Sequence, residues 1–254
     1  MKRLPRRLHH GEEATLVEHL EELRQRIFVC LGAVGLGFVV AFIFHRRLIH
    51  LLVLALPPDH RKLATFTIGE PFMTSMWISL YAGFLVALPV ILWQAWAFFV
   101  PALDPAHERM LRYLTLVATA LLAAGVLFGY YLALPAADHF LAHYDRSQYT
   151  VYIRARDYIS FAAKVLLAMA IVFELPLFVV GLTRTGILTT QKLRRNRRIG
   201  YFVVMCVAVA LPGVDPVTTC FEAAPLLVLY EGSIWASILL DRRAARARAA
   251  ALQV

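Results

Sequence analysis

Long apolar stretches are the feature of this sequence that most limits the folds open to it. An α-helix needs about 20 residues to cross the ~30 Å hydrocarbon core of a bilayer. Stretches near or above that length cover Ile27–Phe44, Pro71–Val100, Leu111–Leu134 and Ile159–Leu182. Hydrophobic residues make up 60% of the chain and charged residues 17%, which is outside the usual range of soluble domains. The sequence therefore predicts an all-α membrane protein.

Two further apolar segments, Ile199–Leu211 and Pro216–Leu240, are separated only by the tight turn "PGVD". We interpret them as a fifth and a sixth crossing. The fifth has about 13 residues and would extend roughly 20 Å at 1.5 Å per residue, which is less than the hydrocarbon core. We therefore expect six transmembrane helices, of which the fifth and sixth are short.

Basic residues indicate how these segments are oriented. Most of the 26 Lys and Arg residues precede the first segment or follow the second, fourth and sixth. Cytoplasmic loops carry the excess of positive charge, so both termini are predicted to be cytoplasmic. This bias also explains the net charge of +9 without a nucleic-acid partner. We divide the chain into a mobile basic N-terminus (1–14), one membrane domain (15–240) and a basic cytoplasmic tail (241–254).

Motifs for catalysis or for binding a cofactor are missing from the sequence. It contains no Gly-rich phosphate loop, nucleophile elbow or H-E-x-x-H pattern, and its 3 cysteines lack C-x-x-C spacing. We expect no enzymatic activity, no cofactor and no metal site.

Two carboxylates at predicted cytoplasmic helix ends are candidate functional residues. Glu22 lies on an amphipathic helix, four residues before Arg26, and that pairing alone is worth only a few tenths of a kcal/mol. Glu108 follows Asp104 and Pro105 in a first helical turn, where the helix dipole favours a carboxylate. Each residue thus has a structural explanation besides a role in binding.

Five motifs, spread in order along the chain, carry a resemblance to a known family. They are "HLEELRQRI" at His19–Ile27, "PVILWQAWAFFVPAL" at Pro89–Leu103, "HERM" at His107–Met110, "FELPL" at Phe173–Leu177 and "PLLVLYEGS" at Pro225–Ser233. Together they resemble the TatC family, the multi-spanning receptor subunit of the twin-arginine protein translocase. The similarity covers about Leu16 to Leu240.

The resemblance implies a concave bundle of six helices in the bacterial cytoplasmic (inner) membrane. It implies recognition of folded cargo through a twin-arginine signal peptide. TatA-like and TatB-like single-span partners would then complete transport driven by the proton-motive force, within a multi-copy complex that includes self-association.

Matching positions imply two groups of site residues. Those expected to bind the signal peptide are Glu22, Glu108, Arg24 and Phe98. Those expected to act as intramembrane polar or partner contacts are Glu174, Tyr130, Asp215, Thr219, Glu222 and Glu231. Thr219 stands where many relatives have glutamine, and Glu222 lies about one turn later, where relatives commonly carry an apolar residue. Glu222 could restore the polar contact to a partner's single span, or it could simply be solvated at the interface, and the residues leave both open.

Glu174 lies inside the apolar run "MAIVFELPLFVV", where a carboxylate costs several kcal/mol unless it faces protein or water. Pro176 removes the helical hydrogen bond to Val172. We hypothesise a polar, hydrated spot on the concave face that thins the bilayer or engages an incoming partner helix. The alternative is a neutral, hydrogen-bonded core glutamic acid.

Two other functions remain open from the residues alone. A proton-coupled small-solute transporter would use Glu174 as its titrating group, although such proteins usually contain internal repeats, which we do not find. A passive membrane scaffold would need none of the acidic positions.

Overall fold

A computed structural model describes residues 16–99, 105–144, 147, 152–184, 188–213 and 215–251. Apart from one isolated bridge between Ala64 and Arg154, the regular structure in these ranges is helical. Five helical segments are long and apolar enough to cross a membrane. The prediction of an all-α membrane protein is therefore confirmed.

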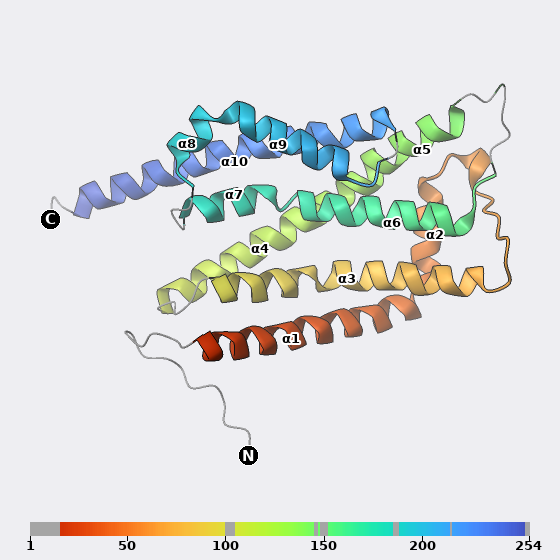
Figure 1. The fold of residues 1–254 in the computed structure, drawn as a ribbon, viewed down its shortest axis with the longest axis horizontal. Helices are drawn as coiled ribbons and strands as arrows, with labels where there is room; N and C mark the ends of the chain where they lie inside the picture. The colour runs from red at the N-terminus through yellow and green to blue at the C-terminus, as the bar shows by residue number, and fades with distance from the viewer. Residues whose placement is uncertain are drawn as a thin grey trace, which may run out of the picture.

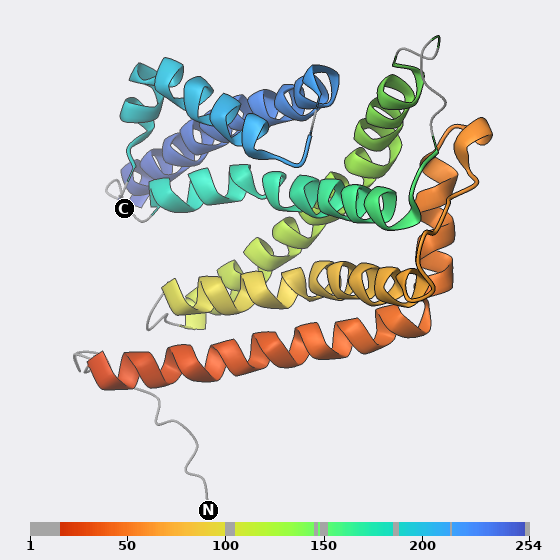
Figure 2. The same cartoon turned by 45° about the vertical axis from the view of Figure 1, so that its right-hand side comes forward.

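The N-terminal part forms two long helices side by side. Helix α1 (Leu16–Ile43) joins the predicted amphipathic segment and the first apolar stretch into one helix. It turns through Phe44 into α2 (His45–Ala55), which a short 3₁₀ turn follows at Pro58–His60. Helix α3 (Glu70–Phe99) then runs back along α1 (Figures 1 and 2).

The third long segment is one helix with a widened turn. Helix α4 (Pro105–Phe128) continues through a π-helical turn at Gly129–Ala133 into α5 (Leu134–His143). In this turn the backbone N–H of Leu134 bonds to the Gly129 carbonyl. Pro135 follows and has no N–H to donate, so a local departure from α-helical bonding is expected there.

The fourth segment is interrupted where the sequence predicted a weakened helix. Helix α6 (Ala155–Val172) ends just before Phe173, and α7 (Leu175–Arg184) begins after Glu174. Pro176 is the second residue of α7. Proline has no backbone N–H, so the Val172 carbonyl has no donor at the position that would have continued the helix.

The last three helices fold back on themselves. Helix α8 (Thr190–Arg195) leads into α9 (Arg197–Ala210), and α10 (Pro216–Ala251) runs beside α9 in the opposite direction (Figure 1). With 14 residues, α9 extends roughly 21 Å and is shorter than the five long segments, as predicted for the fifth crossing.

The expectation of a short sixth crossing is wrong. Helix α10 has 36 residues, of which Pro216–Arg242 are long and apolar enough to cross a membrane. The helix does not end at Leu240, because the following "DRRAARARAA" consists largely of strong helix formers.

Helix α6 is central to the packing. Its buried residues belong to all three clusters of the core. The first cluster also includes α8, α9 and α10, the second α2, α3, the π-helical turn and α5, and the third α3 and α4. One side of α6 is therefore buried, while Arg156 and Lys164 remain exposed.

An ion pair holds the beginnings of α3 and α6 together. Arg154, just before α6, donates to both carboxylate oxygens of Glu70, the first residue of α3, at 2.8 and 3.2 Å. These hydrogen bonds raise the pKa of the Arg154 guanidinium above its usual value. Because this pair joins their first turns, α3 and α6 start at the same end of the bundle and run side by side (Figure 2).

Candidate functional site

The four residues expected to bind the signal peptide come from helix ends at one end of the bundle. Glu22 and Arg24 lie on the second and third turns of α1, Phe98 lies next to the end of α3, and Glu108 lies in the first turn of α4. The beginning of α1, the end of α3 and the beginning of α4 are neighbours in both views (Figures 1 and 2). The side chain of Glu108 and the loop 100–104 lie outside the described residues.

Glu22 forms the predicted ion pair with Arg26. The guanidinium of Arg26 donates twice to the Glu22 carboxylate, once at 3.2 Å, and also donates to Gln94 of α3 at 3.2 Å. The Glu22 side chain is still 48% exposed. Exposed pairs of this kind are worth about 0–1 kcal/mol, so Arg26 holds Glu22 in place without removing it from reach of another guanidinium.

Arg24 points along α1 and not toward Glu22. Its guanidinium carbon lies 5.7 Å from the centre of the Phe28 ring, a cation–π contact at an exposed site. Phe98 is half-buried on α3. The aromatic ring next to Arg24 is thus Phe28 of the same helix, and Phe28 is 61% exposed.

Glu174 is enclosed at the break between α6 and α7. The residue is 2% exposed, and neither carboxylate oxygen has a hydrogen-bond partner among the described residues. The core alternative of a hydrogen-bonded glutamic acid is therefore not observed. Burying a polar group without a partner costs free energy, so this residue is unfavourable for the fold in this conformation.

Glu222 is also enclosed, which excludes interfacial solvation in this conformation. It is 0% exposed, and both its carboxylate oxygens lack a partner in the part of the chain that the structure describes. A Cβ placed on Gly213 would lie 3.3 Å from Glu222 Oε2 and 3.3 Å from Thr218 Cγ2. Sequence reasoning missed Thr218, which shares this buried site, because it considered only Thr219.

Asp215 caps the beginning of α10. Its Oδ1 accepts a hydrogen bond from the backbone N–H of Thr218 at 2.8 Å, and its Oδ2 accepts one from the Thr218 hydroxyl. The Thr219 hydroxyl donates to the backbone carbonyl of Asp215 at 3.0 Å. Both residues expected to contact a partner thus have local partners at the turn before α10.

Tyr130 and Glu231 each join two helices. The Tyr130 hydroxyl donates to the Leu51 carbonyl at 2.9 Å and connects the π-helical turn to α2. Glu231 of α10 accepts a hydrogen bond from the Tyr201 hydroxyl and lies 3.4 Å from Arg197, both near the start of α9. Partners so distant in sequence could not be paired from the sequence alone.

These features define the class of protein: a multi-pass α-helical membrane protein with a carboxylate exposed at one end and carboxyl groups enclosed within the helices. No group of three or more His, Cys, Asp or Glu residues suited to a metal ion occurs among the described residues.

Comparison with known proteins identifies the family. The model of the family described as "Sec-independent protein translocase protein (TatC)" matches residues 18–225, so this chain belongs to the TatC family. It is a component of the twin-arginine translocase and not an enzyme.

Individual relatives agree with this assignment. The chain is 35% identical to the TatC protein of Carboxydothermus hydrogenoformans, over 87% of this chain and 91% of the relative. It is 33% identical to the chloroplastic TATC of Arabidopsis thaliana, over 91% of this chain and 68% of that protein. A crystal structure of the twin-arginine translocase receptor TatC in DDM superposes with a TM-score of 0.77 at 33% identity, covering 87% of this chain and 99% of that one.

The resemblance inferred from the five motifs is thus confirmed. Membership of the translocase family also decides against the proton-coupled solute transporter.

Proposed function

We propose that this chain is the receptor subunit that binds the twin-arginine signal peptide of folded cargo, at a surface made of Glu22, Arg24, Phe98 and Glu108. One observation carries the proposal: the helix ends that bear these residues, far apart in sequence, meet at one end of the bundle (Figure 2). A crystal structure of similar fold is described as that of a receptor, which supports the same role.

The chemistry of carboxylates suits recognition of an arginine pair. A guanidinium presents a planar fork of donors that a carboxylate accepts in two parallel hydrogen bonds, whereas a lysine ammonium is a point charge. Glu22 keeps 48% of its side chain exposed despite its bond to Arg26. Because exposed pairs are weak, specificity also requires an apolar contact, which the neighbouring Phe28, 61% exposed, can provide.

The surface lies, in this proposal, on the cytoplasmic side of a bacterial inner membrane. Six passes then place both termini in the cytoplasm, with α9 as the short fifth pass. Two features support this topology. The beginning of α1 and the end of α10 lie toward the same end of the molecule (Figure 1), and basic residues concentrate in α8, the start of α9 and the end of α10.

TatA-like and TatB-like single-span subunits are the proposed membrane partners, in a multi-copy complex that transports cargo with the proton-motive force. Family membership supports such partners. Helix α10 also carries exposed apolar side chains, among them Val228 and Trp235 at 72% and 58% exposure, which can face lipid or another helix. Glu174 is proposed to act during transport, when partner binding opens the break between α6 and α7.

Photocrosslinking of a labelled twin-arginine peptide to the protein in membranes tests the receptor function. The probe is placed beside the two arginines, and a matched peptide with two lysines is the control. Adducts are expected within the N-terminal half of α1 and the beginning of α4, and only with the arginine peptide. Adducts that form equally with both peptides would contradict the proposal.

A further inference from the structure

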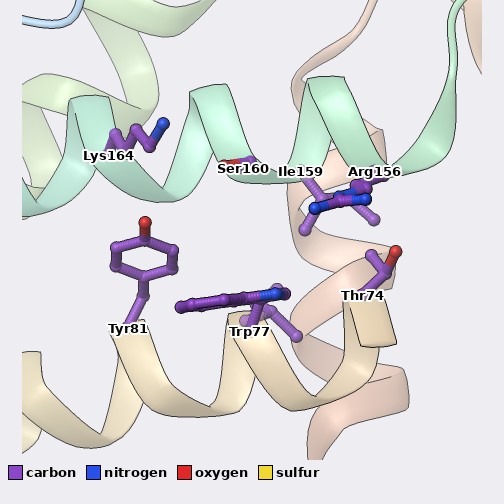
Figure 3. Close-up of a pocket in the computed structure, with 8 residues that line it drawn as sticks. Thr74, Trp77, Tyr81, Arg156, Ile159, Ser160 and Lys164 are labelled. Atoms are coloured by element: carbon purple, nitrogen blue, oxygen red, sulfur yellow. The ribbon is translucent and has the colours of Figure 1, made fainter. Parts of the chain in front are cut away.

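A cavity of about 240 Å³ opens between α3 and α6, away from the candidate signal surface. Trp77 and Tyr81 of α3 form one wall, and Arg156, Ser160 and Lys164 of α6 form the other (Figure 3). Tyr81 points from α3 toward Lys164 (Figure 3). Neither the family motifs nor the proposed function uses any of these residues.

The polar groups in this cavity are almost all hydrogen-bond donors or cations. Among its described lining residues there is no carboxylate. Arg156 and Lys164 are exposed, and the structure records no ion pair or hydrogen bond for either of them within the described ranges. Arg154, two residues before Arg156, differs in this respect. Its guanidinium pairs with the Glu70 carboxylate at 2.8 Å. The cavity therefore offers positive charge without an internal counter-ion, and its natural ligand is an anion.

The position of the cavity limits the source of that anion. Arg156 is the second residue of α6, and Lys164 lies eight residues later, roughly 12 Å deeper along an apolar span. The Glu70–Arg154 pair sets α3 at the same level, so Trp77 lies roughly 10 Å into its own span. Trp, Tyr and long basic side chains with this arrangement are typical of the zone between headgroups and hydrocarbon.

Apolar side chains continue the surface beside the cavity. Met73 and Leu80, one turn before and after Trp77, are 52% and 41% exposed. A ligand here meets cations at one end and an apolar helix surface alongside. A free inorganic anion uses only the first of these features, whereas a phospholipid uses both.

We propose that this cavity binds the phosphate headgroup of an anionic phospholipid in the leaflet near the start of α3 and α6. Arg156 and Lys164 hold the phosphate, Tyr81 and Ser160 provide hydroxyl groups beside it, and the acyl chains lie along Met73, Trp77 and Leu80. Bound lipid then supplies the negative charge that the protein lacks at this place and fills the space between the two helices.

Native mass spectrometry of the purified full-length protein with added lipid tests the proposal. Phosphatidylglycerol should bind in preference to phosphatidylcholine. Arg156→Gln and Lys164→Gln should each weaken phosphatidylglycerol binding roughly fivefold, since one basic residue near an anionic membrane surface contributes about 1 kcal/mol. Lys164→Arg should retain binding. Lys62→Gln is the matched control, because it removes an exposed cation in the loop between α2 and α3, outside the cavity.

Three outcomes would overturn the proposal. The first is an equal loss with Lys62→Gln, which would mean that total charge and not the cavity attracts lipid. The second is full displacement of the lipid by millimolar inorganic phosphate, which would make the ligand a soluble oxyanion. The third combines two results for Lys164→Gln: lipid binding stays unchanged, and crosslinking to a single-span subunit is lost. The ligand of the cavity would then be a carboxylate of that subunit and not a lipid.

A second measurement uses only the unaltered protein and so does not depend on the folding of a variant. A photoactivatable phosphatidylglycerol analogue, with the reactive group near its phosphate, should label peptides that contain Trp77–Tyr81 or Arg156–Lys164. Labelling confined to other helices would contradict the proposed site.

Discussion

Gly37 of α1 and Gly83 of α3 lie directly against each other where the two helices cross. A Cβ on Gly37 would lie 2.6 Å from the carbonyl oxygen of Gly83, and a Cβ on Gly83 would collide with the backbone nitrogen of Phe38. Small residues let transmembrane helices approach this closely, and dispersion contacts between the backbones then hold them together. Since α1 packs mainly on α3, this crossing also positions Glu22.

Gly83→Leu should therefore loosen α1 from α3. We expect a loss of about 1–3 kcal/mol of stability, the usual cost of overpacking, measured as a lower midpoint of thermal unfolding in detergent. Binding of the twin-arginine peptide should weaken as well, because Glu22 moves with α1. Gly35→Leu is the matched control, since a Cβ there meets nothing within 4 Å. If both variants melt like the parent, the close approach does not stabilise the bundle.

Asp215→Ala should destabilise the start of α10. Losing a helix cap costs about 0.5–2 kcal/mol, and Asp215→Asn should recover most of it because an amide oxygen still accepts from Thr218. Thermal unfolding measures the loss, and an export assay separates the two roles of Asp215. A residue that acts only as a cap should keep export in Asp215→Asn. Failure of that variant to export while it melts normally would instead favour the predicted partner contact.

Glu174→Leu should make the protein more stable and less active. Removing a buried carboxyl without a partner relieves a cost of about 1–3 kcal/mol, so the unfolding midpoint should rise. We nevertheless expect export to fall, with signal binding less affected, because the polar group is kept at the expense of stability.

Glu222→Leu is the comparison for Glu174→Leu, because it makes the same exchange at another enclosed carboxyl without a partner among the described residues. The rise in the unfolding midpoint should be similar in the two proteins. Export that stays normal in Glu174→Leu would remove Glu174 from the transport mechanism, whatever its effect on stability.

Local patterns in the sequence predicted most of the helices. The long spans follow from hydropathy and length, the break after Val172 from Pro176, and the Glu22–Arg26 pair from its i,i+4 spacing. Each of these depends only on neighbours within a turn or two. The length of α10 was underestimated for the same reason, because hydropathy marks the end of a span and not the end of a helix.

Contacts between distant segments could not be predicted in this way. Glu70 and Arg154 are 84 residues apart, and Tyr130 and Leu51 are 79 apart. The enclosure of Glu222 depends on how the turn at Gly213 packs against α10. The cavity between α3 and α6 likewise arises only when two helices with unrelated sequence patterns are placed side by side.

Glu22 and Glu108 are expected to bind the two arginine side chains of the signal peptide. Glu22→Gln or Glu108→Gln should weaken peptide binding while leaving the helices inserted, since both residues lie near helix ends. Replacing the arginines of the peptide by lysines should then cost less affinity in these variants than in the parent protein. A bidentate contact that is already lost cannot be lost again, and a double-mutant cycle measures this coupling.

Arg26→Gln is the control for the internal pair, because it removes the partner of Glu22 but leaves the carboxylate, so sensitivity to Arg→Lys should persist. If Glu22→Gln and the parent lose equal affinity on Arg→Lys exchange, the Glu22 carboxylate serves only to pair with Arg26.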